Sequence, residues 1–316
     1  QKAIDIKPKY LPALHNIAKA YRKRKVYDKS VTAYDRVLEL DSDNLYCQII
    51  RGKTLEMANK DALALQGYKK VLEVSQKNTR ALYYAAYLHE KIHETKKALD
   101  YHKAITKITP KDYNSWYRTA LNYESLNDLE EAISYFKEAF SLVPKNLDIC
   151  NKIAYSYERR EEYADSLNYY EQAIELAPNS YYAWNGKAKI YRFLENFDQA
   201  LADAKKALTL EPKNLEVNCN LGYIYKGLKD TDSSSRHFQM SVEIDKNCYP
   251  AWFEIGIDHE NKNNPSMAIA SFETVVNISS HYEEAWFKLA KNYEKLEKYE
   301  KAIDAYTSVT RINPDN

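Results

Sequence analysis

One spacing of 34 residues constrains this sequence more than any other feature. A proline recurs at each step from Pro110 to Pro212, and the same series reaches Pro8 in one direction and Pro314 in the other. No step needs an insertion or a deletion, so the chain is an array of repeats. The fullest copy is the stretch 181–214, whose recurring residues are Trp184, Ala188, Tyr191, Phe197, Ala200, Ala207, Leu210 and Pro212.

Nine consecutive units of 34 residues follow a short opening segment, and we number the places within each unit 1 to 34. In each unit the apolar residues follow helical spacing in two blocks of about 14 residues, separated by a polar turn. Two antiparallel helices, A and B, are therefore expected in each unit. Residues 1–10 fit the end of a truncated repeat, which suggests a fragment of a longer protein. The units span 11–44, 45–78, 79–112, 113–146, 147–180, 181–214, 215–248, 249–282 and 283–316.

Composition favours helix and sets limits on partners. Only six Gly and nine Pro interrupt the chain, and the net charge of +1 gives no overall attraction to nucleic acid or to an anionic membrane. No apolar run approaches the ~20 residues that span a bilayer. We therefore expect a cytoplasmic protein without membrane insertion. The cysteines are far apart in sequence and indicate reduced thiols of an intracellular protein; they are Cys47, Cys150, Cys219 and Cys248.

Packing and capping residues recur at fixed places. Places 8 and 20 are small in every unit, place 24 is usually aromatic, and all four tryptophans occupy place 4. Small residues on facing helices let the backbones approach closely. Place 34 is usually Asn, Asp or Ser, which suits it to cap the next helix A. Units two and seven depart most from the pattern and are expected to be the least stable, through Gln48, Arg51, Asn218 and Ser235.

With these places the units resemble tetratricopeptide repeats over the whole chain. The small residues, the Trp at place 4, the Tyr at place 11 and the terminal Pro all match that family. The resemblance implies an all-α fold, a right-handed α-solenoid superhelix of antiparallel helix pairs that forms a single solenoid over residues 1–316. It also implies that helices A line a concave groove, and that the protein binds peptides or other subunits without performing chemistry.

One motif raises the question of a metal site. His89, Glu90 and His93 satisfy the H-E-x-x-H pattern of zinc proteases, and His102 is a conceivable further ligand. However, His89 occupies place 11, where other units have Tyr, and His102 occupies the aromatic place 24. We therefore interpret both as core residues and place His93 in the turn. We expect no metal, no cofactor and no catalytic residue, since phosphate-binding loops and nucleophile motifs are also missing from the sequence.

The groove of the family is lined by places 5 and 9 of helix A. In this chain those places are largely aromatic in the middle and late units. Tyrosine provides contact area with a polar tip, so these residues are candidates for holding an extended or helical segment of a partner. The alternative is that they pack between neighbouring helices A. The candidate binding residues are Tyr83, Tyr87, Tyr117, Leu121, Asn151, Tyr155, Asn185, Lys189, Tyr223 and Phe253.

Three functions are compatible with the sequence. The first is a non-catalytic scaffold or adaptor within a multi-subunit assembly. The second is a regulatory or targeting repeat region of a larger enzyme. The third is an RNA-binding solenoid, in which groove aromatics would stack on bases, although the near-neutral charge argues against nucleic acid. The sequence leaves open whether the protein forms a homo-oligomer. It also leaves open whether such an assembly lies in a cilium or in the nucleus.

Overall fold

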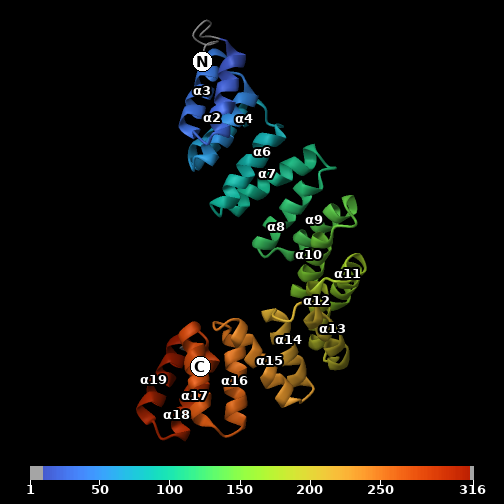
Figure 1. Ribbon diagram of the computed structural model, residues 1–316, viewed down its shortest axis with the longest axis vertical. Helices are drawn as coiled ribbons and strands as arrows, with labels where there is room; N and C mark the ends of the chain where they lie inside the picture. The colour runs from blue at the N-terminus through green and yellow to red at the C-terminus, as the bar shows by residue number, and fades with distance from the viewer. Residues whose placement is uncertain (1–9, 314–316) are drawn as a thin grey trace. The chain divides into compact units, whose positions relative to one another are not determined.

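In the computed structural model, which describes residues 10–313, all the regular elements of that range are helices (Figure 1). Every helix A begins at place 1 of its unit and has 13 residues: α2 Leu11–Lys23, α4 Leu45–Met57, α6 Thr79–Lys91, α8 Tyr113–Ser125, α10 Leu147–Arg159, α12 Tyr181–Phe193, α14 Leu215–Gly227, α16 Tyr249–Asn261 and α18 Glu283–Lys295.

Every helix B begins at place 17 and has 14 residues: α3 Tyr27–Leu40, α5 Asp61–Val74, α7 Thr95–Ile108, α9 Leu129–Leu142, α11 Tyr163–Leu176, α13 Phe197–Leu210, α15 Thr231–Ile244, α17 Pro265–Ile278 and α19 Tyr299–Ile312. The prediction of two helices per unit is therefore confirmed. The truncated repeat expected in residues 1–10 lies outside the described residues, apart from Tyr10.

Contacts divide the chain into two compact units, unit 1 up to Arg160 and unit 2 from Glu161. Within each, a helix A packs against the following helix B, and helix B packs against the next helix A. The predicted all-α fold of helix pairs in tandem is confirmed. That residues 1–316 act as a single solenoid stays a prediction.

Small residues at place 8 accommodate the aromatic ring of place 24 in the same repeat. A Cβ added to Gly52 would lie 2.6 Å from the Tyr68 ring, and one added to Gly222 would lie 2.6 Å from the Phe238 ring. Both glycines lie inside helices, where Gly is otherwise unfavourable. Close approach of the ring to the backbone of helix A is therefore the reason for the small residue, whereas the pattern predicted close approach of the two backbones.

The ends of the helices follow local chemistry. The side chains of Asn44, Asn78, Asn146 and Asn214 accept a hydrogen bond from the backbone N–H three residues later, at 2.9–3.2 Å. Asp112 and Ser180 also cap their helices, which confirms the expected role of place 34.

Between the two helices of every described repeat, place 15 adopts a left-handed conformation with φ between 53° and 63°, although none of these residues is Gly. The sequence pattern did not predict this feature, because Lys, Asn, His and Glu all occupy the place.

The four tryptophans of place 4 each make the same contact in their own repeat. The indole N–H donates to the carbonyl oxygen six residues earlier, at 2.9 Å in all four cases, as in Trp184 to Pro178. This bond ties the start of helix A to the turn that precedes it. In the described range, none of the helices has the length and apolar character needed to cross a membrane.

Candidate partner-binding surface

Two exposed tyrosines lie one turn apart on α6. Tyr83 is 38% exposed and Tyr87 is 43% exposed. Places 5 and 9 are four residues apart and therefore share one face of the helix. We call the face formed by places 5 and 9 of helices A the inner face. The Tyr83 ring makes edge contacts with the rings of Tyr84 and His102, at centroid distances of 5.7 and 6.3 Å.

The neighbouring Tyr84 has a packing role. Its ring stacks on the Tyr68 ring of the preceding repeat at 5.3 Å, and its hydroxyl accepts a hydrogen bond from Lys53 Nζ at 3.2 Å. Beside it, a cleft opens between α6, α7 and the start of α8. Its lining combines aromatic, aliphatic and charged side chains: Thr79, Arg80, Tyr83, Tyr84, Ile105, Thr109, Asp112 and Ser115.

On α8 and α10 the predicted residues are half-buried. The Tyr117 hydroxyl donates to the Asp148 carboxylate on α10, and burial together with this hydrogen bond raises the pKa of Tyr117. The Arg159 guanidinium lies 5.9 Å from the centroid of the Tyr155 ring. The Oδ1 atom of Asn151 is buried and accepts no hydrogen bond from the described residues. Leu121 is half-buried on the same face as Tyr117.

In unit 2, two of the predicted residues are used in packing. Asn185 is only 3% exposed, and its Oδ1 accepts a hydrogen bond from Asn220 Nδ2 at 3.0 Å. Asn220 Oδ1 in turn accepts from Arg192 Nε at 2.9 Å. Phe253 is 7% exposed and packs edge-on against the Tyr282 ring at 5.1 Å. Neither side chain offers much surface to a partner in this structure.

The other two predicted residues of unit 2 keep part of their surface. The Tyr223 ring packs edge-on against Phe238 at 5.0 Å, and burial raises the pKa of its hydroxyl. The Arg192 guanidinium lies 5.3 Å from the centroid of that ring. Lys189 is half-buried, with Nζ 6.0 Å from the centroid of the Phe193 ring.

A polar seam between consecutive helices A was missed by the sequence reasoning. It joins place 12 of one repeat to place 6 of the next, and its members are 28 residues apart. The ion pairs along it have N–O distances of 2.6–3.4 Å. Opposite charges at a spacing of 28 residues were the signal that could have found it. The pairs are Glu90 with Arg118, Glu124 with Lys152, Lys226 with Glu254, and Glu260 with Lys288.

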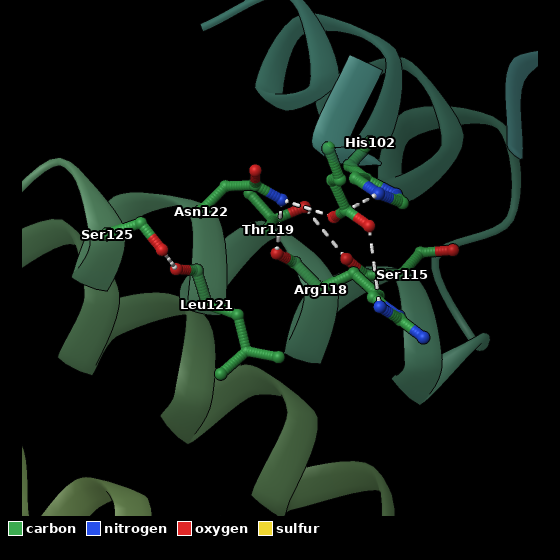
Figure 2. A network of polar contacts seen from close by, with 8 residues as sticks. His102, Ser115, Arg118, Thr119, Leu121, Asn122 and Ser125 are labelled. Carbon is green, nitrogen blue, oxygen red and sulfur yellow. Dashed lines mark hydrogen bonds and ion pairs between the residues drawn. The ribbon is translucent and has the colours of Figure 1, made fainter. Parts of the chain in front are cut away.

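In Figure 2 the side chains of His102 on α7 and of Arg118 and Asn122 on α8 converge on one point. Their common partner is the carboxylate of Glu90. Glu90 Oε1 lies 3.1 Å from His102 Nε2 and accepts from Asn122 Nδ2 at 2.9 Å. Burial by itself would raise the pKa of Glu90, but the hydrogen bonds from His102 and Asn122 outweigh it, and the pKa is lowered.

The same region decides the question raised by the H-E-x-x-H motif. His89 is 2% exposed with its Nδ1 2.6 Å from Glu94 Oε2, and His102 is 1% exposed. His93 lies in the turn, with φ of 60°. The interpretation of His89 and His102 as core residues is therefore confirmed. Among residues 10–313, no group of three or more His, Cys, Asp or Glu side chains is arranged to hold a metal ion.

Comparison with family models decides the classification. Models described as tetratricopeptide repeat match residues 13–45, 113–146, 147–180, 181–214, 215–248 and 283–316. The chain belongs to the tetratricopeptide repeat family. Its members typically act as non-catalytic scaffolds for protein interaction, so the protein is an interaction scaffold in this general sense. A search of curated proteins finds no significant match.

Solved structures share this tetratricopeptide repeat fold at low sequence identity. The APC/C hetero-tetramer Cut9-Hcn1 matches with a TM-score of 0.60 at 14% identity, over 96% of this chain and 73% of that chain. PilF of Pseudomonas aeruginosa matches with a TM-score of 0.59 at 15% identity, over 66% and 96%. A tetratricopeptide repeat protein from Parabacteroides merdae matches with 0.53 at 18% identity, over 78% and 98%.

Proposed function

We propose that this tetratricopeptide repeat protein is a scaffold or adaptor within a multi-subunit assembly, and that it holds a partner segment on the inner face of unit 1. The observation that carries the proposal is the pair Tyr83 and Tyr87, which expose 38% and 43% of their surface on adjacent turns of α6. Adjacent exposed aromatic rings are a common mark of an interaction surface.

The surroundings of the pair support recognition of a segment with both apolar and polar groups. The cleft beside Tyr83 contains Arg80 and Asp112, so a partner backbone could find both donors and acceptors there. Further along the same series of helices, Tyr117 and Tyr155 present half-buried rings. Tyrosine loses little side-chain entropy on binding, which suits it to this use.

Identification of the partner is the first part of the test. A photoreactive benzophenone side chain is placed at Tyr87, and separately at Tyr299, which is 61% exposed at the start of α19. After irradiation in native extract, adducts are identified by mass spectrometry. The proposal expects a specific adduct at position 87 that is missing at position 299.

Affinity measurements complete the test. The cross-linked segment is synthesised, and its Kd is measured for the native protein, for the double variant Tyr83→Ala/Tyr87→Ala and for Tyr299→Ala. Loss of two aromatic anchors should weaken binding by about tenfold or more, with the melting temperature unchanged. Equal affinity of the double variant and the native protein would reject the proposal. A drop in melting temperature together with lost binding would favour a packing role for the two rings.

A further inference from the structure

Two cysteines that are 29 residues apart in sequence meet between α14 and the start of α16. Cys219 occupies place 5 of α14, and Cys248 is the residue that precedes α16. Their Sγ atoms are 3.6 Å apart, and both side chains are free thiols. Two sulfur atoms at this distance are in van der Waals contact, and a disulfide bond of about 2.05 Å requires a further approach of only about 1.5 Å.

Cys248 departs from the usual chemistry of its place. In six of the other repeats, place 34 carries Asn, Asp or Ser, and that side chain caps the next helix A. The Cys248 side chain makes no capping bond to α16. Its sulfur instead faces Cys219, so the residue contributes to a contact between two helices A rather than to a helix end.

From this juxtaposition we infer that Cys219 and Cys248 form a reversible dithiol–disulfide pair that links α14 to the start of α16 under oxidation. The pair lies in an apolar cluster with Phe238, Val242 and Tyr223. Cys219 is half-buried rather than buried, and the oxidant that we assign to the pair is small and uncharged, such as hydrogen peroxide. Burial raises the pKa of Cys219 to about 12, so this thiol attacks peroxide slowly.

Hydrogen peroxide oxidises the two thiols in two steps. The thiolate of one cysteine attacks a peroxide oxygen, an S–O bond forms as the O–O bond breaks, and the leaving hydroxide takes up a proton as water. The sulfur of the second cysteine then attacks the sulfenic acid, an S–S bond forms as the S–O bond breaks, and a second water leaves. The two thiols lose two electrons, and the peroxide is reduced to two water molecules. A thiol reductant reverses the change.

The consequence for the fold is a closed loop that contains all of α15. The cross-link would reduce the conformational entropy of the unfolded chain and would hold α14 and the start of α16 together. We expect the oxidised protein to melt about 5 °C higher than the reduced protein, with the difference abolished by dithiothreitol.

The variant Cys47→Ser/Cys150→Ser tests the inference, since both removed thiols are buried elsewhere and neither is in a disulfide bond. It is treated with hydrogen peroxide, alkylated and digested. The expected result is a peptide linked between Cys219 and Cys248, with a ratio of this disulfide to sulfinic acid about tenfold higher in the native state than in urea. Cys219→Ser and Cys248→Ser in the same background should form no intramolecular link and should show no oxidation-dependent rise in melting temperature.

An equal ratio of disulfide to sulfinic acid in the folded and the urea-unfolded protein would overturn the inference, because the geometry would then play no part. Oxidation of the native protein that yields only sulfinic acid, or only intermolecular disulfides, would overturn it as well. Intact mass after alkylation distinguishes these products. The intramolecular disulfide takes up no alkyl group and is two hydrogen atoms lighter than the reduced monomer, a sulfinic acid adds two oxygen atoms, and an intermolecular disulfide gives the mass of two chains.

Discussion

The Asn218 side-chain amide donates a hydrogen bond to the carbonyl oxygen of Pro212 at 3.1 Å. This is the bond that the Trp184 indole makes to Pro178 one repeat earlier. Gln48 makes the same bond in the second repeat, 45–78, where its Nε2 donates to the Ser42 carbonyl oxygen at 3.3 Å. The two residues that depart most from the apolar pattern of place 4 therefore keep its hydrogen bond. The lower stability expected of these two repeats stays a prediction.

Asn218→Ala should destabilise the protein by about 1–2 kcal/mol, because it removes the amide bonds to Pro212 and Asn214 and leaves His237 Nδ1 without its partner at 3.1 Å. Urea titration followed by circular dichroism measures the free energy of unfolding. Asn247→Ala, at an exposed position in the turn before α16, is the control and should change stability by less than about 0.5 kcal/mol. Equal losses in the two variants would contradict the structural role of Asn218.

Two Gly→Ala substitutions should act in opposite directions. A Cβ at Gly222 would lie 2.6 Å from the Phe238 ring, whereas a Cβ at Gly67 meets nothing within 4 Å. Gly222→Ala should therefore cost about 1–3 kcal/mol through overpacking. Gly67→Ala should gain about 0.5–1 kcal/mol through helix propensity and reduced entropy of the unfolded chain. Thermal melts of the two variants test the pair, and a gain at position 222 would show that the Phe238 ring yields freely.

Relief of the left-handed turn should stabilise the chain. Glu195 occupies place 15 with φ of 56°, a conformation that Asn adopts more readily than Glu. Glu195→Asn should raise the free energy of unfolding by a few tenths to about 1 kcal/mol. The matched control is Glu211→Asn, where φ is −136° and no such gain is expected. A loss of stability at position 195 would contradict the explanation.

The lowered pKa of Glu90 predicts a dependence of stability on pH. Its carboxylate is favoured in the folded state by hydrogen bonds from His102 and Asn122, so its contribution is present above the ordinary pKa of a glutamate. That contribution is lost as the pH falls through the lowered pKa of the folded state. Glu90→Gln should therefore show a smaller loss of stability on acidification from about pH 6 to pH 3 than the native protein. Guanidinium titrations at several pH values provide the measurement, and an unchanged slope would refute the assignment.

Much of the fold was predictable because its signals are local or strictly periodic. The 3.6-residue spacing, the capping residues such as Asn44 and Asn214, and the small residues of place 8 each act within one helix or one helix pair. The left-handed conformation of place 15 was not predicted, because the residues at that place in the different repeats share no single chemical character. The interpretation of His89 and His102 as core residues succeeded because their places already belonged to the repeat.

The candidate binding surface was less predictable. Place 5 is exposed at Tyr83 but 7% exposed at Phe253, although both residues are aromatic at the same register. The difference comes from Tyr282, whose ring covers Phe253 from the end of the same repeat. Register alone therefore identifies the face but not which of its side chains a partner can reach.

The amino-acid sequence by itself determined the number, phase and pairing of the helices, because the repeat period and helix propensities depend on residues close together in the chain. Only the tertiary structure decided which side chains meet across repeats. Asn185 meets Asn220, Cys219 meets Cys248, and Glu90 meets Arg118, each pair being 28 to 35 residues apart. The physical reason is that these contacts depend on the close packing and rotamers of side chains from neighbouring repeats, which the repeat period alone does not specify.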